Sequence, residues 1–184
     1  MTASRHRQFS TITRYSLVQR CLHWITAITV IGLFTLGLWM SDLGYYDPWY
    51  HKGPFWHKSI GLALSALVLL RLTLRLAVGH PPPLASHARW EKLLARITHV
   101  TLYVLMFGAF TSGYLIATAD NRPAPFFGLM EIPALFTAFK HQEDVAGSIH
   151  QICVWSLIVL AGIHALAALK HHFVDHDDTL QRML

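Results

Sequence analysis

The sequence predicts an all-α fold, an integral membrane four-helix bundle, from its low charge and its long apolar stretches. Of 184 residues, 53% are hydrophobic and only 14% are charged, whereas about a quarter of residues are charged in ordinary soluble domains. The charges are clustered. Four mostly apolar stretches lie between the clusters, at 21–41, 55–78, 97–119 and 145–169. Because about 20 helical residues cross the hydrocarbon core, each stretch is long enough to span a bilayer.

Each apolar stretch is expected to be a helix rather than a barrel strand, because it is continuous and rich in Leu and Ala, without alternation. The second stretch differs from the others in containing Lys58, Arg71 and Arg75. Three consecutive prolines at 81–83 separate the second helix from the third. One domain, 1–184, is expected, with helices at about 16–41, 54–78, 91–119 and 145–172.

The basic residues predict the orientation, because Lys and Arg gather on the cytoplasmic side of a membrane. One side of the predicted bundle carries Arg5, Arg7, Arg14, Arg20, Arg71, Arg75, Arg89, Lys92, Arg96, Lys170 and Arg182. The other side carries Lys52, Lys58, Arg122 and Lys140. Both termini are therefore expected in the cytoplasm. The net charge of +5 reflects this bias and attraction to lipid headgroups, so the expected partner is the lipid bilayer and not nucleic acid.

Five of the thirteen histidines lie at membrane depth, where polar groups are costly and mark functional sites. His23, His99, His150 and His164 lie within charge-free stretches, and His57 lies at the outer start of the second helix. His150 and His164 are 14 residues apart, which places them on nearly the same helix face, about 21 Å apart along the axis. One of them is thus expected near each surface of the hydrocarbon core, which is about 30 Å thick.

Depth suggests a partner for each histidine of the fourth helix. His23 lies at the level of His164, and His57 lies at the level of His150, which gives two bis-histidine sites. His99 lies at about the depth of His23, and spacing alone does not choose between them. Paired imidazoles suit the axial positions of haem iron, whereas zinc requires three or four converging ligands. The alternative is that these histidines only form hydrogen bonds between helices.

Other polar residues also allow two interpretations. Arg71 and Arg75 are expected either to pair with haem propionates or to extend toward lipid phosphates. His171 and His172 are expected either to serve a quinone, as carbonyl donor or proton relay, or to be interfacial residues. The outer cations, with Lys58 and Arg122 among them, are candidates to attract a small anion, but acidic residues on that side cancel much of the field. Those acidic residues are Asp42, Asp47, Asp120, Glu131, Glu143 and Asp144.

Several short motifs, in their order and spacing, resemble the bacterial cytochrome b561 family over nearly the whole chain. They are Arg14-Tyr15-Ser16, Leu22-His23-Trp24, His57 with Gly61, the run from Arg71 to Leu76, Asn121-Arg122, Phe127-Gly128-Leu129, His150, Gly162-Ile163-His164, His171-His172, Asp178-Thr179-Leu180 and Arg182-Met183. The resemblance implies a multi-pass protein of the bacterial inner membrane with two haem b groups. It implies that His23 pairs with His164 and His57 with His150, with His99 as a supporting residue.

The resemblance also implies a function. A close relative oxidises superoxide on the periplasmic side and passes the electrons to ubiquinone, so the expected activity is that of a superoxide oxidase, with Arg122 and Lys58 as candidate catalytic residues. The alternative is an electron-transfer subunit docked to a periplasmic dehydrogenase or hydrogenase. A haem-free transporter or scaffold is a third possibility, disfavoured because no helix is broken near the bilayer middle.

Overall fold

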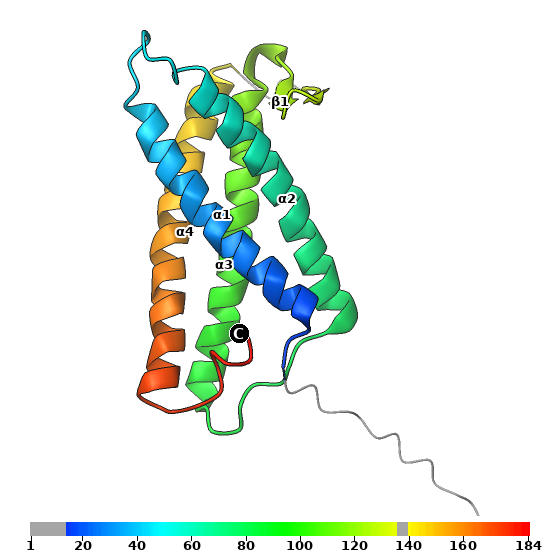
Figure 1. Ribbon diagram of the computed structural model, residues 1–184, viewed down its shortest axis with the longest axis vertical. Helices are drawn as coiled ribbons and strands as arrows, with labels where there is room; N and C mark the ends of the chain where they lie inside the picture. Colours follow the sequence, from blue (N-terminus) through cyan, green and yellow to red (C-terminus); the bar gives the residue numbers. More distant parts are fainter. Residues whose placement is uncertain (1–13, 136–139) are drawn as a thin grey trace, which may run out of the picture.

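The computed structural model describes residues 14–135 and 140–184, so Arg5 and Arg7 lie outside the described residues. It contains four long helices, α1 (Leu17–Ser41), α2 (Lys52–Val78), α3 (Arg89–Ala117) and α4 (Gln142–Phe173) (Figure 1). All four are long and apolar enough to cross a membrane, which confirms the predicted fold class.

The helix ends differ from the expected positions by a few residues. α4 begins three residues earlier than expected and includes Glu143 and Asp144 in its first turn. Carboxylates are favourable at a helix N-terminus, where the macrodipole is positive, so charge does not exclude these residues from the helix. α3 ends at Ala117, and a short 3₁₀ turn, η1 (Ala119–Asn121), with Asp120 at φ 56°, follows it.

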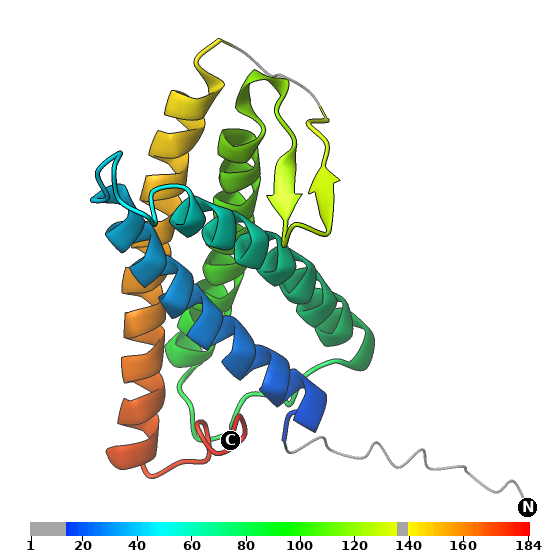
Figure 2. The ribbon, with the colours of Figure 1, turned by 45° about the horizontal axis from the view of Figure 1, so that its top comes forward.

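The helices pack as two close pairs, α1 with α2 and α3 with α4, and α2 also contacts α3 (Figures 1 and 2). The backbones of α1 and α4 make few contacts, and the same holds for α2 and α4. A small apolar core closes the middle of the bundle, formed by Leu64, Val68, Met106 and Leu157. The backbone of α4 therefore lies close to that of α3 and further from those of α1 and α2.

A hairpin between α3 and α4 was not predicted. Its strands are β1 (Ala124–Phe126) and β2 (Met130–Ile132), paired antiparallel with Phe126 opposite Met130. Phe127 and Gly128 both have positive φ, as the tight turn requires. The buried Ser59 of α2 holds the hairpin, because its hydroxyl donates to Pro125 O (3.3 Å) and accepts from Phe127 N (2.9 Å).

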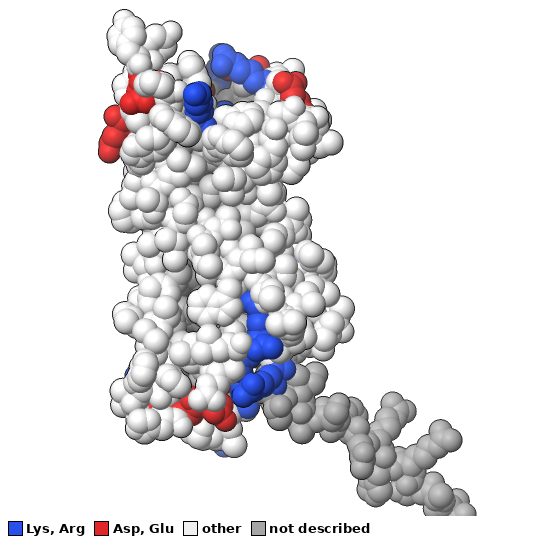
Figure 3. All heavy atoms as spheres, in the orientation of Figure 1, with Lys and Arg blue, Asp and Glu red and all other residues white. Residues whose placement is uncertain are grey.

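The two ends of the bundle differ. The N-terminal boundary of the described chain and the C-terminus lie at the same end, called the terminus-side end, whereas the hairpin marks the hairpin-side end (Figure 1). On the face shown in Figure 3, the Lys, Arg, Asp and Glu side chains lie toward the two ends, and the middle of the bundle carries other residues. The C-terminal tail after α4 folds back over the terminus-side end, where Met183 O accepts from Trp24 Nε1 (2.9 Å) and Pro82 O accepts from the Arg182 guanidinium (2.7 Å).

Candidate functional site

One pair of histidines lies near the hairpin-side end. The rings of His57 (α2) and His150 (α4) have their centres 6.3 Å apart, with their planes at 71°. Both side chains are partly buried. The pair thus bridges two helices whose backbones make few contacts with each other.

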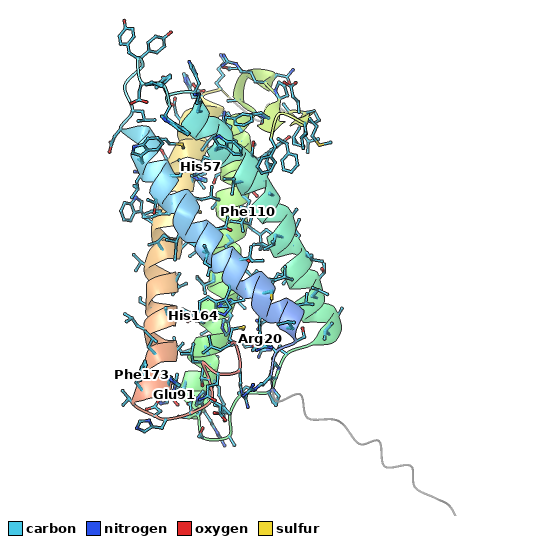
Figure 4. All side chains as sticks on the ribbon, viewed as in Figure 1. Arg20, His57, Glu91, Phe110, His164 and Phe173 are labelled. Atoms are coloured by element: carbon cyan, nitrogen blue, oxygen red, sulfur yellow. The ribbon has the colours of Figure 1, made fainter. Side chains whose placement is uncertain are left out.

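A second pair lies toward the terminus-side end. The ring centres of His23 (α1) and His164 (α4) are 6.5 Å apart, with their planes at 78°. Figure 4 shows His164 well below His57, with Phe110 between their levels. His99 (α3) also approaches His164, at 5.2 Å between ring centres. The structure therefore places three histidines around the terminus-side site and two around the hairpin-side site.

The ring spacings fit the insertion of one metal between each pair. An imidazole nitrogen binds a metal at about 2 Å and the ring centre lies about 1 Å further, so two axial rings on one iron are about 6 Å apart. The separations of 6.3 Å and 6.5 Å match this value. The His99–His164 separation of 5.2 Å is shorter than it. The residues present thus fit two bis-histidine haems.

His150 is held in one tautomer by α3. Its Nδ1 donates to Ala109 O (2.9 Å) and lies 3.3 Å from the Ser112 hydroxyl. The proton is therefore on Nδ1, which leaves Nε2 as the nitrogen with a free lone pair for a metal. The buried Nδ1 of His57, in contrast, has no hydrogen-bond partner among the described residues.

Two glycines that sequence reasoning missed make room for the hairpin-side pair. A Cβ on Gly37 of α1 would lie 3.3 Å from Cε1 of His57, and one on Gly113 of α3 would lie 3.2 Å from Cε1 of His150. Gly61, one turn after His57 in the chain, has open space around its own Cβ position. The sequence does indicate the position of Gly37. It follows His23 by 14 residues in the same helix and therefore lies at the depth of the hairpin-side pair.

Arg71 lies beside the terminus-side pair. Its guanidinium donates to His23 Nδ1 (2.8 Å) and also lies over the Tyr103 ring, 5.7 Å from the centre. Arginine only donates hydrogen bonds, so this contact requires His23 Nδ1 without a proton. A neutral His23 that binds a metal through Nε2 carries its proton on Nδ1, so metal binding and this hydrogen bond exclude each other. Arg75, one turn further along α2, is partly buried.

The predicted quinone histidines have different surroundings. His172 packs edge-on against Phe173, with ring centres 4.8 Å apart. His171 stacks on His87, with ring centres 4.5 Å apart. Its Nδ1 lies 2.7 Å from Asp175 Oδ2 and 3.3 Å from Asp177 Oδ2.

The carboxyl groups of Asp175 and Asp177, which lie beside His171, are ionised over the physiological range. Burial opposes the ionised form of Asp177, but hydrogen bonds from Thr179 and His87 outweigh it and lower the pKa of Asp177 to about 2. A hydrogen bond from Lys170 is the main cause that lowers the pKa of Asp175.

The candidate superoxide residues lie at the hairpin-side end. Lys58, next to His57 in α2, lines an open pocket of about 470 Å³ together with Tyr50, His51 and Pro125. Arg122, just before β1, has 78% of its side chain exposed and forms a loose ion pair with Asp120 (3.7 Å). Lys58 and Arg122 are close enough to interact electrostatically. The structure thus places two cations at the hairpin-side end, and one of them, Lys58, lines the pocket.

The chain is similar to several known proteins. Residues 14–184 match the family described as Prokaryotic cytochrome b561. The chain is 46% identical to Cytochrome b561 homolog 2 of Escherichia coli over 175 residues, which cover 95% of this chain and 93% of the relative. It is 28% identical to the Probable superoxide oxidase CybB of Yersinia pestis, over 93% of this chain and 96% of the relative. Cytochrome b561 homolog 1 of Escherichia coli is 26% identical, over 94% of this chain and 98% of the relative.

Proposed function

Because the chain belongs to the prokaryotic cytochrome b561 family of haem b membrane electron-transfer proteins, we propose that it is a di-haem superoxide oxidase of the bacterial inner membrane. It takes electrons from superoxide at the periplasmic face and delivers them to ubiquinone at the cytoplasmic face. The observation that carries this proposal is the presence of two histidine pairs at opposite ends of one bundle, each with the ring spacing of a bis-histidine iron site. When bound, the two haems supply a pair of one-electron centres.

In this proposal His57 and His150 hold the periplasmic-side haem, and His23 and His164 hold the cytoplasmic-side haem. His99 supports His164 from α3 and does not bind iron, in accordance with its shorter ring distance. With a haem on His23 Nε2, Nδ1 of His23 would carry the proton, so the Arg71 guanidinium would be free to hold a haem carboxylate. The orientation follows from the excess of Lys and Arg at the terminus-side end, which faces the cytoplasm.

At the periplasmic face, Lys58 and Arg122 attract the superoxide anion toward the pocket beside His57. Two superoxide ions each lose one electron and leave as dioxygen. One ubiquinone gains both electrons and takes up two protons to become ubiquinol. The acidic residues of the same face reduce the attraction, so the effect of the two cations is local. The relative named as a probable superoxide oxidase supports this substrate.

At the cytoplasmic face, the quinone role predicted for His171 and His172 is assigned to His172. Two carboxylates lie close to Nδ1 of His171, whereas the contact made by the His172 ring among the described residues is with Phe173, which leaves its ring nitrogens for a quinone carbonyl. Leu157 lies midway between His150 and His164 in α4 and belongs to the apolar core between the two sites. This core keeps water out of the region through which electrons pass from one site to the other.

The test is a reduced-minus-oxidised absorption spectrum of the detergent-purified protein with haem counted per chain, followed by ubiquinone reduction driven by a superoxide source. Two low-spin b-type haems and superoxide-dependent ubiquinol formation are expected. Two haems without this activity would remove the catalytic proposal and favour a subunit that accepts electrons from a docked dehydrogenase. A protein without haem would overturn the whole proposal.

A further inference from the structure

A second group of ligating side chains lies at the terminus-side end, outside the histidine pairs of the proposed haem sites. His87 comes from the connection between α2 and α3, His171 from the last turn of α4, and Asp177 from the C-terminal tail. Their side chains are 15%, 15% and 12% exposed, so the cluster is largely shielded from solvent. Three segments far apart in the sequence thus bring two imidazoles and one carboxylate together.

From this cluster, we propose that His87, His171 and Asp177 form a binding site for one divalent transition-metal cation of the zinc type, which fastens the C-terminal tail to α4 and to the α2–α3 connection.

The distances suit such a cation. His87 Nε2 lies 2.8 Å from Asp177 Oδ2, and His171 Nδ1 lies 3.3 Å from the same oxygen. The three candidate ligand atoms all lie within 4.8 Å of one another. Ligands at about 2 Å from a tetrahedral zinc are about 3.3 Å apart, so small side-chain movements bring all three into range. The fourth position is left to water.

The nitrogen of His171 provides an independent indication. Its Nδ1 is buried and makes no hydrogen bond to any described residue, although two carboxylate oxygens lie within 3.3 Å of it. Those oxygens are therefore close to the nitrogen but not in line with a ring N–H. Toward His171, Asp177 thus lies at the distance of a ligand that shares a cation with the ring, without the in-line geometry of a hydrogen bond.

The carboxylate of Asp177 is also oriented by its own partners. Its Oδ1 accepts from Thr179 N (2.8 Å), which turns Oδ2 toward the two histidines. The backbone N of Asp177 donates to His171 O (3.1 Å), which fixes the tail against the end of α4. Such hydrogen bonds to a ligand set its direction and raise its affinity for a metal.

The charges around the cluster permit a cation. Lys170 precedes His171 in the chain, and its ammonium is neutralised by Asp175 (2.6 Å) and Glu91 (3.7 Å). Two imidazoles with one carboxylate favour zinc and its neighbours in the first transition row, whereas magnesium and calcium prefer sites made only of oxygens. The proposed site therefore discriminates against the abundant cytoplasmic magnesium.

The test is equilibrium dialysis of the haem-loaded, tag-free protein in detergent against Zn²⁺, with zinc and haem both measured per chain. One tightly bound zinc per chain is expected, not displaced by excess Mg²⁺. His87→Ala and Asp177→Asn should each weaken this binding at least about tenfold, as loss of a ligand does. His176→Ala, in the same tail but outside the cluster, should bind zinc like the unchanged protein.

A second measurement separates metal binding from a folding defect. Zinc should raise the thermal unfolding midpoint of the unchanged protein and of His176→Ala, and leave that of His87→Ala unchanged. Unaltered haem content in each variant shows that the bundle is intact. Zinc affinity that is the same in the unchanged protein, His87→Ala and Asp177→Asn would overturn the proposal, as would an equal loss in His176→Ala.

Discussion

His57 and His150 face each other with 6.3 Å between their ring centres, although the helices that carry them share few backbone contacts. A protein core normally closes such a space by packing. Here Gly37 and Gly113 lie beside the two rings and have no side chains. A Cβ on either glycine would press against one of the rings. The sequence therefore places residues without side chains beside the two rings, which suits a flat ligand held between two imidazoles.

The first prediction concerns the ligand assignment. His150→Ala should leave one haem per chain in place of two, because no described side chain other than His150 is paired with His57. His164→Ala should likewise lose one haem, at the other end. His99→Ala should keep both, since its ring lies too close to His164 to leave room for an iron between them. Haem per chain is measured on purified protein. Loss of a haem in His99→Ala with retention in His23→Ala would reverse the assignment.

The second prediction tests the glycine that borders His57. Gly37→Ala adds a methyl 3.3 Å from Cε1 of His57, so the ring must shift by a few tenths of an ångström. Fewer chains should carry the haem on that side, and its midpoint potential should move. Gly32→Ala is the matched control, because it lies in the same helix with nothing within 4 Å of the added carbon. Both substitutions gain about 1 kcal/mol of helix propensity. Equal haem content and potentials in the two variants would show that Gly37 does not shape the site.

Much of this architecture is readable from the sequence. The four spans follow from hydropathy alone, and depth along the helices brings His57 to His150. The spacing of 14 residues between His150 and His164 also recurs in the other three helices. It separates His23 from Gly37, His57 from Arg71, and His99 from Gly113. Each helix thus presents one residue to each site. This spacing identifies Gly37 and Gly113 as residues of the hairpin-side site, although neither is close to His57 or His150 along the chain.

Other features had no accessible signal. Strands of three residues are too short for periodicity to reveal, and the hydroxyl of Ser59 that ties β1 to α2 belongs to an ordinary helical serine. The tail returns to α1 because Trp24 donates to the carbonyl of Met183, and a backbone carbonyl is present at every residue. Depth could not separate His23 from His99, since both approach His164. Only the ring distances distinguish these two neighbours.

The third prediction concerns Arg71 and electrostatics at the cytoplasmic-side site. A positive charge close to a haem favours the reduced iron, so Arg71→Gln should lower the midpoint potential of one haem. A shift of about 60 mV corresponds to a tenfold change in a one-electron equilibrium, and a change of this order is expected. Arg71→Lys keeps the charge and should shift the potential less. The measurement is a redox titration followed by absorption. A shift in both haems, or in neither, would contradict a local role for this guanidinium.

The fourth prediction addresses the hairpin. Ser59→Ala removes the acceptor of Phe127 N and the donor to Pro125 O at a site with no solvent exposure. A buried amide without a partner costs about 1–3 kcal/mol, so the thermal unfolding midpoint in detergent should fall. Ser148→Ala is the control, since its exposed hydroxyl bonds only to Asp144 O within its own helix. If the two variants unfold at the same temperature, the hairpin is not held through Ser59.

The fifth prediction tests the route of the anion. Arg122→Glu places a negative charge at an exposed position of the hairpin-side end, so superoxide decay in stopped flow should slow by up to about tenfold at low ionic strength. The loss should shrink as salt rises, because exposed charges more than about 10 Å apart are screened at 0.1 M. Arg96→Glu makes the same change in net charge near the terminus-side start of α3 and should leave the rate unchanged. Both variants should retain two haems. If Arg122→Glu consumes superoxide as fast as the unchanged protein at every ionic strength, Arg122 has no part in capture, and Lys58 beside the pocket becomes the residue to substitute next.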